Sequence, residues 1–175
     1  MFGPLNYRPR TPVFRRQFLT YFPPIAALAL SSACQPPARK DKRIIAAQGE
    51  RVECGVLVFN VLESVWLPQL GEMPMVRTPK HRFLKIRLSV TNGGGSMTGC
   101  PMQSILDAND NAYPELNDIQ NLDEWLGVLR MMPPGGTEIG WIVFDAPQTA
   151  YTLRLTDGLI ENEHVGYVKI PYSLE

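Results

Sequence analysis

The sequence lacks any uninterrupted run of about 18 apolar residues, the length that a helix needs to cross a bilayer. The 175-residue chain also contains only two histidines, and neither His81 nor His164 belongs to a compact ligand or triad motif. A glycine-rich phosphate cradle is missing too, because the glycines of 93–95 and 135–136 follow predicted strands and no helix opens after them. A mature membrane-spanning helix and a nucleotide-binding loop are therefore excluded, and we predict no catalytic residue, metal ion or cofactor.

Acidic residues are absent from the first 33 positions, which carry Arg8, Arg10, Arg15 and Arg16. Removing these positions leaves 13 basic and 17 acidic residues, so the rest of the chain has a formal charge of about −4. A protein that binds nucleic acid needs a basic face that replaces the phosphate counterions. The charge balance therefore argues against nucleic acid as a partner.

Residues 1–33 contain the three parts of an export signal in their usual order. Arg15 and Arg16 form the basic head, 25–30 is a short apolar run, and 31–33 are small. The arginine pair with the Phe-Leu that follows it resembles a twin-arginine export signal, although the residue before the pair departs from that pattern. We predict a signal peptide over 1–33, and the general secretory route stays open as the alternative.

Cys34 directly follows small residues, as the cysteine does in the lipobox of bacterial lipoproteins. Leu30 lies four positions before Cys34, whereas the pattern usually places leucine three positions before it. A cysteine that carries two acyl chains is stably anchored in a bilayer. We therefore expect membrane lipid to be bound through Cys34 and the chain to lie in the cell envelope. The alternative is an ordinary signal peptide that is cut near Ala33 and leaves an incidental cysteine.

Residues 34–50 are predicted to form a lipidated, flexible tether, since prolines at 36–37 and mixed charges over 39–43 favour a solvated spacer. The remaining residues, 51–175, are expected to form one domain. Its roughly 125 residues are enough to bury a core without metal ions or dense disulfides.

The dominant pattern of this domain has period two, which is typical of half-buried strands. Apolar residues at 84, 86, 88 and 90 alternate with polar ones, and the Asn-Gly-Gly-Gly that follows favours a turn. Only 118–125 could hold a helical turn. The predicted strands are 52–65 (a central strand with a bend), 84–90, 105–106 and 112–113 (a hairpin), 127–131, 138–144, 151–156 and 165–170. We predict an all-β fold, an immunoglobulin-like antiparallel β-sandwich of seven or eight strands.

The order of these strands resembles a known family. Its more specific marks are the Val-Thr-Asn that ends the strand at 83–92 and the Phe-Asp-Ala-Pro of 144–147. The chain is similar over about 55–172 to exported immunoglobulin-like domains that are grouped as a domain of unknown function and are related in fold to a mycobacterial immunoprotective secreted antigen. The resemblance implies this architecture and an extracytoplasmic location, and it brings no established activity or catalytic residues.

Cys54 and Cys100 remain once Cys34 is assigned to lipid. In an oxidising compartment an even pair usually forms a disulfide. Such a bond would close a loop of about 46 residues and stabilise the fold by roughly 3–4 kcal/mol. We predict the bond, and two separate thiols are the alternative.

The other candidate sites have simpler explanations. The acidic and amide residues of 107–118 resemble a calcium loop, yet Ala112 stands where that loop needs glycine, so a polar turn is favoured. The methionines at 73, 75, 97 and 102 are assigned to packing instead of soft-metal ligation. Trp141 is expected in the core. Trp125, in an irregular segment, is the candidate binding residue, or else it plugs the end of the sandwich.

These observations lead to a non-enzymatic, membrane-anchored lipoprotein that acts as an interaction or structural module, with another envelope protein as a possible partner. The alternative is an extracytoplasmic receptor for a small ligand or metal, which would use the 72–81 loop or the 107–118 hairpin. A weaker third option is an envelope hydrolase whose residues come from distant loops.

Overall fold

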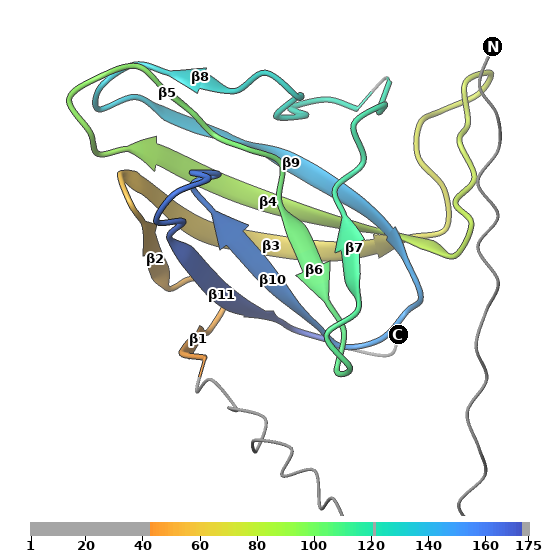
Figure 1. The fold of residues 1–175 in the computed structure, drawn as a ribbon. Helices are drawn as coiled ribbons and strands as arrows, with labels where there is room; N and C mark the ends of the chain where they lie inside the picture. Colours follow the sequence, from red (N-terminus) through yellow and green to blue (C-terminus); the bar gives the residue numbers. More distant parts are fainter. Residues whose placement is uncertain (1–42, 121, 173–175) are drawn as a thin grey trace, which may run out of the picture. The chain divides into compact units, whose positions relative to one another are not determined.

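The computed structural model describes residues 43–120 and 122–172. They form two facing sheets and one short strand pair (Figure 1). The first sheet has the order β2 (Arg51–Cys54), β3 (Leu57–Leu67), β4 (Arg82–Asn92) and β9 (Thr137–Ala146). The second has the order β1 (Ile45–Ala46), β11 (Val165–Ile170), β10 (Tyr151–Thr156), β6 (Ser104–Leu106) and β7 (Ala112–Pro114). The short pair is β5 (Thr98–Gly99) and β8 (Met131–Met132).

The named strands of the described residues pair in antiparallel fashion except β1 and β11, which are parallel. An isolated bridge between Trp125 and Trp141 is parallel as well. The described residues contain no helix, so none that could cross a membrane is found among them. The predicted all-β sandwich is therefore confirmed. The signal peptide with Arg15 and Arg16, the Cys34 anchor and most of the tether lie outside the described residues and stay predictions.

The core lies between the two sheets, and the period-two pattern of the sequence produces it. Alternate side chains of a strand point to opposite faces, so Leu84, Ile86 and Leu88 of β4 all enter the core. Leu153 and Leu155 of β10 meet them from the other sheet. Each of these five side chains has no exposed surface. Burial of a leucine or isoleucine side chain contributes roughly 1.5–3 kcal/mol.

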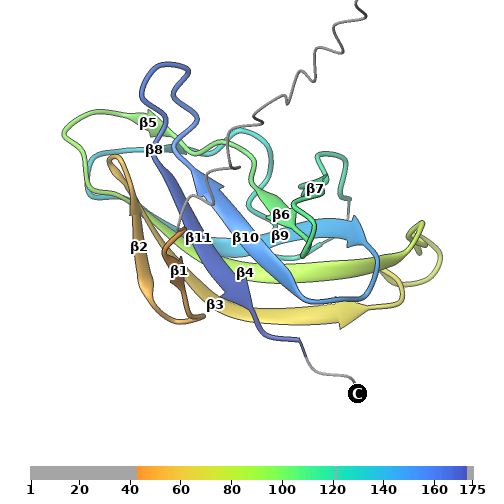
Figure 2. The ribbon, with the colours of Figure 1, turned by 60° about the horizontal axis from the view of Figure 1, so that its bottom comes forward.

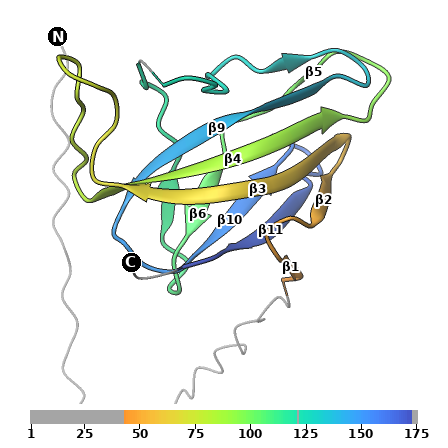
Figure 3. The same ribbon diagram turned by 180° about the vertical axis from the view of Figure 1, so that it is seen from behind.

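A second apolar cluster covers the outer face of the four-stranded sheet. Phe83 and Val143 point away from the main core and pack with Leu70 and Ile119. Ile119 belongs to the long connection between β7 and β8, residues 115–130, which we call the strap. Figure 3 shows the strap running along the free edge of β9.

The strap pairs with β9 through three backbone hydrogen bonds. Trp141 donates to the Glu124 carbonyl at 2.8 Å, and the Trp141 carbonyl accepts from Leu126 at 3.1 Å. Leu116 donates to the Val143 carbonyl at 2.8 Å. Since unpaired strand edges recruit other chains, the strap shields part of this edge.

Three predicted elements differ from the structure. The predicted strand 52–65 is a hairpin of β2 and β3, because Gly55 adopts a φ of 59° and turns the chain. The predicted strand 127–131 shrinks to the two residues of β8, since Gly127 (φ 71°) and the exposed residues after it belong to the strap. In the segment 118–125, the described residues form a turn at 123–124 and a bridge from Trp125 to β9, and none of them is helical.

Gly140 lets the strap approach β9. A Cβ atom at this position would lie 2.4 Å from the Glu124 carbonyl oxygen and 2.9 Å from Leu126 Cγ. We predict that Gly140→Ala forces the strap outward and lowers the free energy of unfolding by about 1–3 kcal/mol, the usual range for overpacking. Urea unfolding followed by tryptophan fluorescence measures this change.

Gly95→Ala is the matched control, because a Cβ there would meet nothing within 4 Å. We expect it to change stability by less than about 0.5 kcal/mol, as surface substitutions usually do. Equal effects of the two substitutions would contradict the close strap contact.

Candidate functional site

The buried polar residues of the described chain gather at one end of the sandwich. They lie where β4, β7 and β10 end and where β6 and β8 begin, which we call the polar end. Buried polar groups have to be paired, so such a gathering fixes several chain segments relative to one another. These residues are Asn92, Gln103, Glu115, Arg130 and Thr156.

An ion pair between Glu115 and Arg130 lies at the centre of the polar end. The side chains are 0% and 1% exposed, respectively. Arg130 Nη2 donates to Glu115 Oε1, and Nη1 donates to Oε2 at 3.2 Å. These two residues are the first and the last of the strap, so the pair closes its ends together.

Backbone groups complete the hydrogen bonding of this pair. The Gln103 amide donates to Glu115 Oε2 at 3.0 Å. Arg130 Nε donates to the Gly127 carbonyl at 2.7 Å, and Nη1 donates to the Pro101 carbonyl at 3.3 Å. Burial raises the pKa of Glu115, and the opposing effect of Arg130 only partly offsets it. The carboxylate therefore depends on the guanidinium to remain charged in this dry environment.

Gln103 connects the strap end to β10. Its Oε1 accepts from the Thr156 amide at 2.8 Å, and its Nε2 donates to the Pro101 carbonyl at 2.5 Å. Asn92 connects β4 to β8, because its Nδ2 donates to the Met132 carbonyl at 3.0 Å. The side-chain amides therefore tie both sheets to the segments that surround the ion pair.

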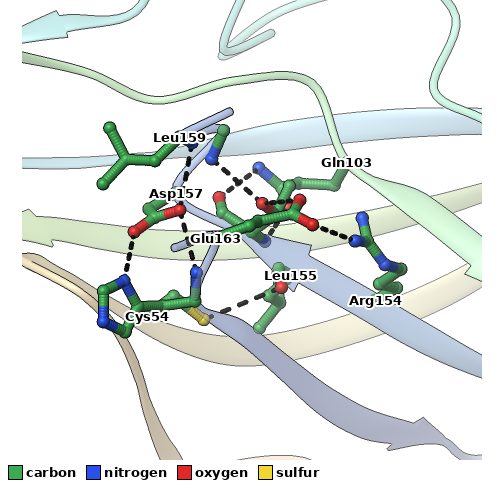
Figure 4. Close-up of polar contacts among 10 residues, drawn as sticks. Cys54, Gln103, Arg154, Leu155, Asp157, Leu159 and Glu163 are labelled. Carbon is green, nitrogen blue, oxygen red and sulfur yellow. Dashed lines mark hydrogen bonds and ion pairs between the residues drawn. The ribbon is translucent and has the colours of Figure 1, made fainter. Parts of the chain in front are cut away.

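The loop between β10 and β11 is built around Asp157 (Figure 4). Its Oδ1 accepts from the amides of Leu159 and His164, each at 3.2 Å, and its Oδ2 lies 2.7 Å from His164 Nδ1. Burial opposes the charge on this side chain, but these hydrogen bonds outweigh that effect and lower the pKa of Asp157. Asp157 thus stays ionised at neutral pH and shapes the loop.

Glu163 fastens the other side of the same loop. It accepts from the Thr156 hydroxyl and from Arg154 Nη2, the latter at 2.8 Å. Hydrogen bonds from these two residues lower the pKa of Glu163. Because both ends of the loop are held, its tip is presented to solvent in a defined conformation; Figure 2 shows the loop projecting beside β5 and β8.

Exposed apolar side chains surround the polar end. Leu129 is 91% exposed and Ile160 101% exposed, although apolar residues of this size are usually buried. Leu129, with Val128 and Met131, also lines a shallow hollow of about 290 Å³ that Pro101 and Gly158 border. We call the exposed apolar side chains at this end of the sandwich the apolar rim; its members are Val128, Leu129, Met131, Leu159 and Ile160.

Cys54 and Cys100 are both buried near this end, but no bond joins them in the structure. This differs from the predicted disulfide and matches the alternative of two separate thiols. The Cys54 thiol donates to the Leu155 carbonyl at 3.7 Å, and the Cys100 thiol donates to the Pro101 carbonyl at 3.6 Å. Each sulfur therefore has its own backbone partner.

Trp125 is half-buried and packs against the cluster on the outer face of the four-stranded sheet. Its indole Nε1 is buried and has no hydrogen-bond partner among the described residues. Trp125 thus belongs to the part of the strap that packs on the outer face of the sheet. This position differs from the alternative in which Trp125 plugs the end of the sandwich, and the binding role of Trp125 stays a prediction. Trp141 is buried as expected, but on the outer face, where Lys85 Nζ lies 3.8 Å from its ring centroid.

The structure does not bring the other candidate ligands together. Met73 and Met75 lie in the loop before β4, whereas Met97 lies in the loop after it, at the opposite end of that strand. Asp107, in the hairpin turn, accepts from the backbone amides of Asn109 and Asn111, which makes it a turn-forming residue. Among the described residues, no group of three His, Cys, Asp or Glu side chains is placed to hold a metal ion.

Sequence reasoning missed the ion pair that organises the polar end. Glu115 and Arg130 are 15 positions apart in irregular segments, so no periodic pattern marks them. The apolar rim was missed as well, since Leu129 was placed in a predicted strand. The one available signal was the pair of apolar residues at 159–160 inside a polar turn sequence.

The two facing sheets define the chain as a β-sandwich protein. The chain belongs to the family described as a domain of unknown function, DUF4352, whose model matches residues 46–164. No curated protein matches the chain.

Solved structures of other proteins share the fold. The yjhA protein from Bacillus subtilis is 17% identical, with a TM-score of 0.56, and the match covers 73% of this chain and all of that one. A functionally unknown protein from Listeria monocytogenes is 9% identical, with a TM-score of 0.54 and coverage of 74% and 85%. The secreted protein MPT63 from Mycobacterium tuberculosis is 15% identical, with a TM-score of 0.52 and coverage of 74% and 98%. The expected likeness to a mycobacterial secreted β-sandwich is confirmed for the fold.

We predict that Glu115→Gln lowers the free energy of unfolding by about 3–5 kcal/mol, because it leaves the Arg130 charge buried without a counter-ion. Replacing both residues, as in Glu115→Leu/Arg130→Met, should recover much of this loss. Denaturant unfolding of the single and double variants measures both effects.

Glu124→Gln is the control, because Glu124 forms a more exposed ion pair with Arg87 at 2.9 Å. Its expected cost is about 1 kcal/mol or less. If Glu115→Gln lowers the free energy of unfolding no more than Glu124→Gln does, the buried pair does not hold the polar end together.

We also predict that Cys54 and Cys100 react with iodoacetamide only after denaturation. Burial raises the pKa of each thiol to about 11, so both stay protonated and inaccessible in the folded protein. Peptide mass spectrometry of unreduced protein, alkylated in denaturant, should find both cysteines modified. Detection of a disulfide-linked pair of peptides that contain Cys54 and Cys100 would contradict this prediction and support the bond predicted from the sequence.

Proposed function

We propose that this chain is an exported, lipid-anchored protein of the cell envelope whose β-sandwich binds another envelope protein and catalyses no reaction. The observation that carries the binding role is the apolar rim. Leu129 and Ile160 keep almost all of their surface in water, which is unfavourable unless a partner covers it. The rigid support beneath the rim preorganises it for contact, and this lowers the entropy lost on binding.

The chemistry at the polar end favours binding over catalysis. Asp157 already engages His164 Nδ1, and the pair serves to shape the loop. The thiols of Cys54 and Cys100 remain protonated at neutral pH because burial raises the pKa of each to about 11. Neither cysteine therefore supplies the thiolate that a nucleophilic mechanism needs.

The point at which the chain enters the domain fits a rim that is free to bind a partner. Arg43, the first described residue, pairs with Asp110 in the turn between β6 and β7. That turn lies at the opposite end of the hairpin from Gln103 and Glu115. If the anchor is at Cys34, the chain enters the domain away from the rim, which leaves the rim free for a partner.

Site-specific photo-cross-linking in the producing cells tests the binding role. A photoreactive residue at Ile160 of the full chain should give one defined protein adduct, whereas the same residue at exposed Asn109, in the β6–β7 turn, should not. Leu129→Ser should weaken the adduct at 160 without affecting folding, because Leu129 is almost fully exposed. Absence of any adduct at 160, or an adduct equally strong at 109, would exclude the rim as the contact surface.

Cys34→Ala tests the anchor. We expect the full-length variant to move from the membrane fraction to the soluble fraction and to lose labelling by a radioactive fatty acid. Cys100→Ala serves as the control and should leave both properties unchanged. Labelling that persists in the Cys34→Ala variant would refute lipidation at this residue.

A further inference from the structure

We infer that the domain lies against the anionic surface of the bilayer that holds its anchor, and that a patch where the chain enters the domain makes the contact. This inference rests on the proposed lipid anchor and adds the surface with which the domain meets the membrane. We call the patch the entry face; its members are Ile44, Ile45, Lys169, Pro171 and Tyr172.

Strand pairing brings the members of the entry face together. β1 pairs with β11 at the edge of the five-stranded sheet, with Ala46 opposite Val168 (Figure 2). Val168 belongs to the core and Ala46 packs against it. Because successive side chains of a strand point to opposite faces, Ile45 and Lys169 lie on the outer face of the sheet. Tyr172 follows β11 directly at its end.

The entry face is apolar and exposed. Ile44 is 90% exposed, Ile45 50% and Tyr172 36%. A hollow of about 510 Å³ with a mostly apolar lining lies beside them, and its walls include Lys169, Pro171 and Tyr172. Exposed apolar surface of this kind is unfavourable in water and is stabilised when another apolar medium covers it.

The length of chain before the entry face limits its distance from the anchor. Arg43 lies nine positions after Cys34. Nine residues span at most about 30 Å, even when fully extended. A lipid on Cys34 therefore keeps the entry face close to the bilayer at all times. A short connection gives a high effective concentration, so a weak attraction to the bilayer surface is enough to hold the domain there.

The charge near the entry face is opposite to that of the rest of the domain. Residues 39–50 contain four basic and two acidic residues, whereas residues 51–175 contain nine basic and fifteen acidic ones. Lys169 is exposed and forms no ion pair among the described residues. Of the nearby carboxylates, Asp110 is paired with Arg43, and Glu50 accepts from the Ala47 amide at 2.7 Å. Basic residues beside a bilayer are attracted by anionic headgroups.

These features favour a bilayer over other occupants. Isoleucine and tyrosine beside lysine and arginine are typical of surfaces that lie among lipid headgroups. A second copy of the chain would bring two basic surfaces together, which is unfavourable. The apolar rim lacks this chemistry, because residues 157–164 contain three acidic residues and neither lysine nor arginine.

Contact through the entry face would leave the apolar rim away from the bilayer. β11 runs from the loop that carries Leu159 and Ile160 to Lys169 and Pro171. The rim residues of this loop and the hollow of the entry face therefore lie beyond opposite ends of one strand. The membrane would thus orient the domain so that the rim is presented to a partner.

Paramagnetic relaxation tests the contact in the lipidated full chain. The protein is reconstituted into phosphatidylglycerol nanodiscs that contain a lipid with a gadolinium headgroup. We expect the relaxation enhancement of the Ile45 and Tyr172 amides to exceed that of the Leu129 and Ile160 amides at least about threefold, because the effect falls steeply with distance. In phosphatidylcholine nanodiscs this ratio should fall at least about twofold, since the headgroups carry no net negative charge.

Two variants separate the apolar and the charged parts of the contact. Ile44→Ser should lower the ratio, whereas the matched control Ile160→Ser should leave it unchanged, since both isoleucines are almost fully exposed. Lys169→Glu should remove the dependence on phosphatidylglycerol, because it reverses the charge at the hollow.

The contrary outcomes are equally specific. Equal enhancement at both pairs of amides, greater enhancement at the rim, or the same ratio in both lipids would overturn the inference. A ratio that rises only when each nanodisc carries two copies would also overturn it and would identify contact between copies.

These outcomes separate the inference from the proposed function. Protein that elutes with the nanodiscs but shows equal enhancement would retain the anchor and discard only the entry face. Protein that fails to elute with them would refute the anchor and, with it, this inference. A cross-link at Ile160 in cells would support the rim in either case.

Discussion

The polar end of this sandwich depends on the ion pair between Glu115 and Arg130. Two charges withdrawn from water are costly unless each finds its counter-ion and enough hydrogen bonds. Here the guanidinium and carboxylate meet directly, and backbone groups of Pro101, Gln103 and Gly127 complete their shells. The pair therefore acts as a specific fastening between chain segments that share no strand pairing.

The strap is the first consequence of this fastening. Its two ends are joined by the pair, and the residues between them cover the outer face of the four-stranded sheet and part of the β9 edge. The second consequence is the apolar rim, because Val128 and Leu129 directly precede Arg130 and are fixed at the surface with it. A buried polar interaction and an exposed apolar surface are thus parts of one arrangement.

The fold could be predicted from the sequence where strands obey a simple period. The alternation of β4 and the turn after Asn92 are visible in the order of residues alone, and the sandwich follows from repeating that pattern. For 52–65 the sequence indicated one strand with a bend, whereas Gly55 turns the chain fully and makes the hairpin of β2 and β3. The apolar residues on both faces of this segment do not show how sharp the turn is. The strap was misread for a related reason, since apolar residues at 126–129 resemble a strand when their exposure is unknown.

The candidate site was less accessible to sequence reasoning. The sequence favoured a bond between Cys54 and Cys100, because two cysteines remain for an oxidising compartment once Cys34 is assigned to lipid. It could not show that each thiol has a separate backbone acceptor. Nor could it show that Glu115 and Arg130 meet, because their contact depends on how two irregular segments fold back. Membership of the family predicts the architecture of the domain. The proposed contact surface, the apolar rim, can be recognised only from the exposure of its side chains in the structure.

Amide hydrogen exchange in an Arg130→Met variant of the full chain tests the central claim most directly. If the ion pair fastens the strap, the amides of Leu116, Leu126 and Trp141 should exchange much faster than in the unmodified protein. The amide of Ile86 in β4, which pairs with β3 and β9, should keep most of its protection. Unchanged exchange at the strap, or a uniform increase that includes Ile86, would contradict the account.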